Sequence, residues 1–238
     1  MTPTLIVTRP APQGAAYADA VQARWAGSLE VIQSPLLHIV PVPLSPMVAQ
    51  AEALILTSVN GVAVAAEAGL PAGMAAWCVG EKTGQAAQDA GFSPIVGPAD
   101  AEGLIGMISA AGPAMTLVHI RGEHSRGNIA ERLTDAGLRC TEVIGYKQHA
   151  KKLNAAALDA LTSGAPVVFP LFSPRTAEIL VENGPFTTPI DVVAISSAVE
   201  VIAVDLQPRF MVVADRPDVG GVVDATIACL NALCSRVQ

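Results

Sequence analysis

The sequence has little charge, few aromatic residues and no long apolar runs. Charged side chains make up 15% of the 238 residues and aromatic side chains 4%, whereas hydrophobic residues reach 51% and the mean hydropathy is +0.46. This share of apolar residues excludes a disordered chain. No uninterrupted apolar run approaches the roughly 18 to 20 residues that a membrane-spanning helix needs, which argues against a membrane protein. The length allows one large domain or two small ones.

Cysteine and clustered basic residues are also scarce. Cys78, Cys140, Cys229 and Cys234 form no C-x-x-C pair and are not paired with nearby histidines, so we expect reduced, buried thiols and no metal. The first residues lack a basic segment followed by a long apolar stretch, which argues against a signal peptide and favours the cytoplasm. A pI near 5.0 disfavours a nucleic-acid partner, because phosphate neutralisation needs a clustered basic face. We expect a monomer.

Short apolar, β-branched runs alternate with alanine-rich helical stretches along the chain, which predicts an α/β fold built from parallel βα units. The predicted strands are residues 5–8, 29–33, 53–57, 76–79, 93–96, 116–120, 167–172, 192–195 and 210–213. The predicted helices are residues 13–25, 59–68, 82–90, 101–110, 125–136, 154–162, 175–183, 197–205 and 221–234. Gly69, Gly91, Gly137 and Gly184 follow helices at the position where a left-handed residue is favoured.

Two strand-like segments, residues 36–43 and 140–150, break this alternation because neither is followed at once by a helix. We interpret them as connector strands that pair as a two-stranded β-ladder. Domain 1 then consists of residues 1–35 and 151–238 and is discontinuous in sequence. Domain 2 consists of residues 44–139.

An internal repeat supports two similar domains. Three elements recur in the same order, offset by 115 to 119 positions, and each of the first two is a strand that runs into a small or hydroxyl residue and then a helix. The matched segments are 54–60 with 169–175, 78–83 with 194–199, and 97–104 with 216–222.

Hydroxyl and basic residues concentrate where predicted strands lead into helices. In open parallel sheets, ligands bind outside the carboxyl ends of strands, at helix N-termini. Backbone N–H groups, a small hydroxyl and a nearby cation together suit a carboxylate or phosphate. The candidate binding residues are Thr8, Arg9, Thr57, Ser58, Asn60, Gly80, Lys82, Thr83, Arg121, Arg126, Ser173, Arg175, Ser196 and Ser197.

These residues also have simpler interpretations. Ser58, Ser173 and Ser196 are good N-cap residues, and capping can coexist with anion binding. The Walker spacing G-x-x-x-x-G-K-[ST] and the dinucleotide fingerprint G-x-G-x-x-G are both absent, which disfavours a nucleotide site. Neither H-E-x-x-H nor G-x-S-x-G occurs, so a catalytic metal and a serine hydrolase are disfavoured.

Tyr146 is one of two tyrosines and lies on the second connector beside Lys147. A phenol can donate a proton or a hydrogen bond to a departing hydroxyl, and a neighbouring lysine can favour the phenolate. The alternative is an aromatic residue that simply packs on a connector strand.

The motifs, taken in order, resemble those of the uroporphyrinogen-III synthase family, and the resemblance covers nearly the whole chain. The segments that carry it are Thr8-Arg9-Pro10, Leu56-Thr-Ser58-Val-Asn-Gly61, Val79-Gly-Glu-Lys-Thr83, Ile120-Arg-Gly122, Val143-Ile-Gly-Tyr146, Phe172-Ser-Pro174 and Ala194-Ile-Ser196. The resemblance implies two α/β domains joined by a two-stranded ladder, with the substrate in the cleft between them.

The resemblance also implies a reaction. Members of the family cyclise hydroxymethylbilane, a linear tetrapyrrole with eight carboxylates, to uroporphyrinogen III, with loss of water and inversion of ring D, and they use neither metal nor cofactor. Tyr146 matches the family's cleft tyrosine and is the expected proton donor. Hydroxyls with adjacent amides would bind the carboxylates, and five cations would complement their charge: Arg9, Lys82, Arg121, Arg126 and Arg175. Transient contact with the preceding enzyme of the pathway is a further expectation.

The rival interpretation is a two-domain module that binds or senses a small anion in the same cleft. The sequence also departs from the family pattern at Pro170, because proline cannot donate to a sheet ladder. We therefore expect the strand around Pro170 to be bulged or to lie at a sheet edge.

Overall fold

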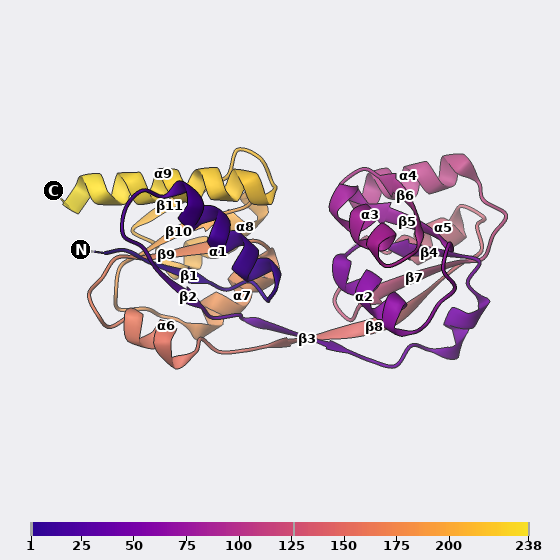
Figure 1. Cartoon of the computed structure of the whole chain (residues 1–238), viewed down its shortest axis with the longest axis horizontal. Coiled ribbons are helices and arrows are strands. Elements are labelled where there is room, and N and C mark those ends of the chain that lie inside the picture. Colours follow the sequence, from indigo (N-terminus) through magenta and orange to yellow (C-terminus); the bar gives the residue numbers. More distant parts are fainter. Residues whose placement is uncertain (1, 126, 238) are drawn as a thin grey trace. The chain divides into compact units, whose positions relative to one another are not determined.

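The computed structural model describes residues 2–125 and 127–237, which divide into two compact units (Figure 1). Unit 1 consists of residues up to His38 and from Ala150 onward, and unit 2 of Ile39–His149. The α/β fold with parallel βα units in two sheets is as predicted from the sequence. Among the described residues, no helix is long and apolar enough to cross a membrane.

Unit 1 is built on a parallel five-stranded sheet in the order β11-β10-β9-β1-β2. Its strands are β1 (Thr4–Val7), β2 (Glu30–Gln33), β9 (Val167–Leu171), β10 (Ile190–Ala194) and β11 (Phe210–Val213). Its helices are α1 (Gln13–Arg24), α6 (Ala155–Ala160), α7 (Pro174–Asn183), α8 (Ser197–Ala203) and α9 (Val219–Val237), with a 3-10 turn at Val204–Leu206.

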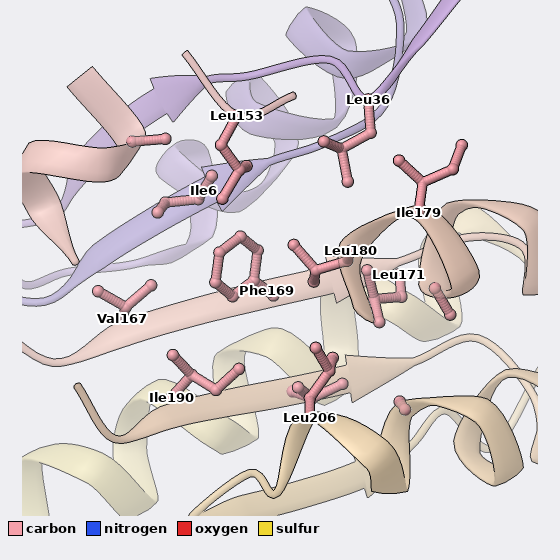
Figure 2. Close-up of a cluster of buried hydrophobic side chains, with 14 of the residues drawn as sticks. Ile6, Leu36, Leu153, Val167, Phe169, Leu171, Ile179, Leu180, Ile190 and Leu206 are labelled. Carbon is pink, nitrogen blue, oxygen red and sulfur yellow. The ribbon is translucent and has the colours of Figure 1, made fainter. Parts of the chain in front are cut away.

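Successive residues of the unit 1 strands supply two separate cores, because side chains alternate between the faces of a sheet. Ile6 and Phe169 point into the core beneath α6, α7 and α8, together with Leu153 and Leu180 (Figure 2). Leu5, Val7 and Val168 point to the opposite face, where they pack against α1 and α9. Both faces of the sheet are therefore covered, as parallel sheets require.

Unit 2 is built on a six-stranded sheet in the order β3-β8-β7-β4-β5-β6. Its strands are β3 (Leu37–Pro41), β4 (Ala53–Leu56), β5 (Ala75–Val79), β6 (Ser93–Gly97), β7 (Leu117–Gly122) and β8 (Cys140–Ala150). Helices α2 (Val59–Glu67) and α3 (Gly80–Asp89) cover one face, and α4 (Ala101–Ala111) and α5 (Ile129–Asp135) cover the other. A 3-10 turn spans Pro46–Gln50.

The two sheets share one strand order. Reading β11-β10-β9-β1-β2 against β6-β5-β4-β7-β8 pairs β9 with β4, β10 with β5 and β11 with β6, as the sequence repeat does. The remaining pairs, β1 with β7 and β2 with β8, match only if the N-terminal strands of unit 1 are counted after β11. The repeat is therefore circularly permuted between the units.

Strands β3 and β8 pair with each other, and the chain passes from one unit to the other through them. The Val42 N–H donates to the Gly145 carbonyl and the Lys151 N–H to the Leu36 carbonyl, each at 2.9 Å, so the pair is antiparallel. Strand β8 is more than a connector, because its residues from Cys140 to Tyr146 also pair with β7 in parallel.

Two local expectations about helix ends are wrong. The helix expected from residue 125 begins only at Ile129, because Gly127 and Asn128 have φ of +92° and +44°, which a right-handed helix does not accept. Gly184 ends α7 in an extended conformation rather than a left-handed one. Gly69, Gly91 and Gly137 do have positive φ, as expected.

The expectation that the strand at Pro170 is bulged or at an edge is also wrong, because β9 is the central strand and pairs with β10 without a register shift. The Pro166 carbonyl accepts the Thr4 N–H, whereas the Leu171 carbonyl accepts the Ile195 N–H. The backbone N–H and C=O groups of even-numbered residues of β9 therefore point toward β1, and those of odd-numbered residues point toward β10. The missing N–H of Pro170 therefore falls on the β1 side. Pairing with β1 ends at Val168, so β9 remains central without a donor at Pro170.

Two glycine substitutions in unit 2 should have opposite effects on its stability. Gly91 has φ of +87°, so alanine there should lower the free energy of unfolding by about 1 kcal/mol. Gly106 lies exposed inside α4 with open space around an added methyl group, so alanine there should raise it by about 0.5–1 kcal/mol. Urea unfolding followed by Trp77 fluorescence in a Trp25→Phe background would measure both. Equal effects of the two substitutions would contradict the backbone argument.

Candidate active site

The strand order of unit 2 gathers polar groups at the carboxyl ends of its parallel strands, which form one edge of the sheet. Strands β7, β4 and β5 run parallel and adjacent, with the first part of β8 beside β7. Thr57 and Ser58 follow β4, Gly80 follows β5, and Gly122 ends β7 opposite Tyr146 of β8. This edge also carries the N-termini of α2 and α3, whose free N–H groups favour anions.

At this edge, Ser58 and Tyr146 are in direct contact. The Ser58 Oγ lies 2.9 Å from the Tyr146 hydroxyl oxygen and accepts the Gly61 N–H at 3.2 Å. Ser58 has extended backbone angles and is the N-cap of α2, so its side chain is held at the helix start. The cap and the contact with the phenol therefore use one oxygen atom.

A β-bulge directs Tyr146 toward Ser58. Arg121 pairs with Ile144, but Gly122 pairs with Tyr146, so Gly145 is an extra residue in β8. Regular alternation from the buried Val143 would place Lys147 on the Ser58 face, and the bulge places Tyr146 there instead. Lys147 is exposed, and its Nζ lies 3.8 Å from a Glu123 carboxylate oxygen.

Two glycines leave room for this arrangement. A Cβ at Gly145 would lie 2.8 Å from Ile120 Cγ2, and one at Gly122 would lie 2.6 Å from Tyr146 Cε2. Both distances are shorter than packed carbon atoms tolerate. The Tyr146 ring is only 5% exposed, and it packs flush against the backbone of β7 with its hydroxyl toward Ser58.

Thr57 has a buried histidine as its partner. Its Oγ1 lies 3.4 Å from His119 Nε2, and His119 is 1% exposed. Burial lowers the pKa of His119 to about 4, so the imidazole is neutral at neutral pH. The Nδ1 atom is buried and has no hydrogen-bond partner among the described residues. An N–H there would be an unsatisfied donor, so the geometry favours the tautomer in which Nε2–H donates to Thr57.

Arg121 is held by neighbouring groups of its own unit. Its Nη2 donates to the Glu142 carboxylate at 2.5 Å, and its Nη1 donates to the carbonyls of Gly122 and Glu123 at 2.8 and 3.0 Å. The bond to Arg121 lowers the pKa of Glu142. The charge of Arg121 is therefore already balanced within the sheet.

The other unit 2 candidates lie on α2 and α3. Asn60 is in the first turn of α2, and Gly80 begins α3 with φ of +68°. Thr83 is buried one turn into α3, and Lys82 is exposed beside it. Arg126 lies outside the described residues.

In unit 1, the remaining candidates also follow strands β1, β9 and β10. The Oγ1 of Thr8 is buried, and no residue in the described part of the chain forms a hydrogen bond with it. The Arg9 guanidinium lies 4.5 Å from the centre of the Phe172 ring, and burial lowers the pKa of Arg9. The Ser173 Oγ caps α7 by accepting the Thr176 N–H at 3.1 Å.

Arg175, Ser196 and Ser197 complete the unit 1 set. The Arg175 Nη1 contacts the Glu178 carboxylate at 3.2 Å. Ser196 occupies the N-cap position of α8, although its side chain makes no capping hydrogen bond, and Ser197 is exposed. Among the described residues, no group of three or more His, Cys, Asp or Glu side chains is placed to hold a metal ion.

A comparison with protein families shows the family to which the chain belongs. A family model described as uroporphyrinogen-III synthase HemD matches residues 18–224. The chain belongs to the uroporphyrinogen-III synthase family. Uroporphyrinogen-III synthases are cyclising lyases of haem biosynthesis, and nothing favours the rival interpretation as an anion-binding module.

Solved structures of uroporphyrinogen-III synthases have a fold similar to that of this chain. A uroporphyrinogen-III synthetase from Helicobacter pylori 26695 is 16% identical, with a TM-score of 0.68 over 96% of this chain and 100% of that one. A mutant uroporphyrinogen III synthase from the extremely thermophilic bacterium Thermus thermophilus is 15% identical, with a TM-score of 0.58 over 98% of this chain and 100% of that one. No curated protein gives a significant sequence match.

Three residues that shape the candidate site were not among the residues predicted for it: His119, Gly122 and Gly145. A histidine in an apolar run is expected to be buried, but the contact of His119 with Thr57 depends on the pairing of β4 with β7. The isolated glycine in the strand-like segment 140–150 was the available signal for a bulge.

Acidification should lower the free energy of unfolding of unit 2, because His119 is buried in its neutral form. The unfolded chain takes up a proton near the usual histidine pKa of 6.5, whereas folded unit 2 resists protonation until about pH 4. Stability should therefore fall as pH drops through this window, by about 3 kcal/mol from His119. His119→Leu should reduce the loss between neutral pH and about pH 4 by this amount, measured by urea unfolding through Trp77 with Trp25→Phe as parent. An identical loss in both proteins would contradict the buried, neutral state.

Proposed function

We propose that this chain cyclises hydroxymethylbilane to uroporphyrinogen III, with loss of water and inversion of ring D, and that the unit 2 site supplies the proton. The family match over residues 18–224 carries the proposal. The Ser58–Tyr146 contact at the carboxyl edge of the unit 2 sheet supports the assignment of the proton source.

The reaction consists of steps that side chains can promote without an added group. Protonation of the terminal hydroxyl lets it leave as water, while the adjacent pyrrole nitrogen donates its electron pair and forms an azafulvenium cation. The substituted α-carbon of ring D attacks this cation and forms a spiro intermediate. The bond from that carbon to its original methylene bridge then breaks, the free α-carbon of ring D attacks the bridge instead, and the proton on that carbon is lost as the pyrrole is restored, which leaves ring D inverted. Only water leaves overall and no electrons are exchanged with an outside group. The protein therefore needs an acid, carboxylate donors and control of substrate conformation.

We propose that carboxylate recognition relies mainly on hydroxyls and backbone amides. Thr57, Ser58 and Thr83 lie at or near the N-termini of α2 and α3, where the helix dipole favours anions. A Thr57 that accepts from His119 has its own O–H free to donate to a substrate oxygen. The other proposed contacts are Thr8, Arg9, Asn60, Gly80, Lys82, Arg121, Arg126, Ser173, Arg175, Ser196 and Ser197.

We further propose a cytoplasmic monomer that meets the preceding enzyme only transiently. Among the described residues, Cys78, Cys140 and Cys234 form no disulfide, which fits a reducing compartment. Hydroxymethylbilane closes spontaneously without inverting ring D, so rapid transfer between the two enzymes would limit the type I by-product.

Removing the Tyr146 hydroxyl should lower turnover far more than stability. Tyr146→Phe keeps the buried ring and loses one hydrogen bond, so unfolding should become easier by only about 1 kcal/mol. Loss of the acid should lower kcat for type III product by about 10²-fold or more. The assay supplies hydroxymethylbilane, oxidises the products and separates the type I and type III isomers by chromatography.

Tyr17→Phe is the matched control. Tyr17 is also buried, and its hydroxyl contacts Thr226 Oγ1 at 2.7 Å in unit 1, so the stability cost should be similar. Its turnover should remain that of the wild type, because Tyr17 lies outside the proposed site. Unchanged turnover in Tyr146→Phe would show that Tyr146 has a packing role. A wild-type protein that forms type I product and no type III product would refute the proposed function.

A further inference from the structure

The Ser58 hydroxyl is more exposed than the Tyr146 phenol that it contacts. The phenol is only 5% exposed because its own unit covers it, and its oxygen contacts Ser58 Oγ at 2.9 Å. Ser58 is only partly buried and begins α2 at the carboxyl edge of the sheet. Of the two hydroxyls, Ser58 is therefore the more accessible.

The hydrogen bonds of Ser58 allow one arrangement that makes it a donor to substrate. A serine oxygen has one O–H and two acceptor positions. One acceptor position takes the Gly61 N–H at 3.2 Å. If the other takes the Tyr146 O–H, both acceptor positions are occupied, and the Ser58 O–H is free to donate away from the protein.

We propose that Ser58 is a second catalytic residue, which delivers the proton to the departing hydroxyl and is reprotonated by Tyr146. This inference rests on the proposed function and adds the group that carries the proton from the buried phenol to the substrate.

The proton transfer balances within one turnover. The Ser58 O–H protonates the substrate hydroxyl as its C–O bond breaks, water leaves, and the Tyr146 O–H restores Ser58. The phenolate that remains is stabilised by the azafulvenium cation formed in the same step. When the closed macrocycle releases a proton to restore the pyrrole, that proton returns through Ser58 to Tyr146. Net, hydroxymethylbilane gives uroporphyrinogen III and water.

The structure holds the relay in place from both sides. The N-cap bond to Gly61 fixes Ser58, and the absence of a side chain at Gly122 lets the phenol pack onto β7. Proton transfer between oxygens requires such hydrogen-bond distances, because efficiency falls steeply when donor and acceptor separate.

Substitutions at Ser58 separate the relay from the helix cap. Ser58→Asn keeps an N-cap oxygen that can accept from Gly61 but has no O–H to pass on, so single-turnover formation of type III product should fall about 10²-fold. KM should change little, because the backbone amides at the start of α2 and the hydroxyls of Thr57 and Thr83 remain to bind the carboxylates. Ser58→Thr keeps both the cap and the hydroxyl, and should restore most of the rate.

The solvent isotope effect tests the number of moving protons. In mixtures of H₂O and D₂O, the wild type and Ser58→Thr should give a curved dependence of the single-turnover rate on deuterium fraction, because two protons move together. Ser58→Asn should give a smaller effect with a linear dependence.

Ser58→Ala and Asp100→Ala form a matched pair for loss of a cap. Asp100 caps α4 in the same unit by accepting the Gly103 N–H at 2.7 Å. Both variants should lower the urea midpoint of unfolding, measured through Trp77, by a similar amount, but only Ser58→Ala should lose turnover. A folded Ser58→Asn with wild-type type III turnover would overturn the relay and leave the proposed function standing. A wild type that makes only type I product would overturn both.

Discussion

One extra residue in strand β8 determines which side chain meets the start of α2. Without the bulge at Gly145, the strict alternation of a β-strand would turn Lys147 toward Ser58 and Tyr146 away from it. The bulge is possible because Gly145 can approach Ile120 more closely than any side chain could. The contact between Ser58 and Tyr146 therefore depends on a backbone irregularity, which the regular pairing of the surrounding strands holds in one place.

The strands, helices and strand-end location of the candidate site could be predicted from the sequence. Buried parallel strands are short apolar runs, and in this class of fold polar residues that follow them lie at a shared edge, so Thr57, Ser58 and Gly80 were found by position alone. The partners of these residues could not be predicted, because they depend on which strands become neighbours. His119 reaches Thr57 only because β7 pairs with β4, and Glu142 neutralises Arg121 only because β8 pairs with β7. The expectation of a bulged or edge strand at Pro170 was wrong because the rule for proline in strands does not say which side of the strand lacks the N–H donor.

The permuted repeat shows how two similar folds can differ in chemistry. Ser173 follows β9 as Ser58 follows β4, and both cap the next helix. In unit 2 the serine oxygen contacts a phenol from β8, which β7 separates from β4, whereas in unit 1 it contacts Thr176 Oγ1 at 2.9 Å within its own helix. The shared part is a serine-capped helix start, and the contact with a phenol belongs to one copy. A formal charge of −7 does not by itself exclude a polyanionic ligand, because local amide and hydroxyl groups outweigh net charge at short range.

The division of the chain into a continuous unit and a discontinuous one has a consequence for synthesis on the ribosome. Unit 2 is complete once His149 has been made, so its sheet can form while the rest of the chain is still being translated. Strands β1 and β2 are made first, yet the partner of β1 on its other side, β9, follows more than a hundred residues later. Strands β1 and β2 must therefore wait for β9 before the sheet of unit 1 can form, and unit 2, which carries Tyr146, can be assembled before unit 1.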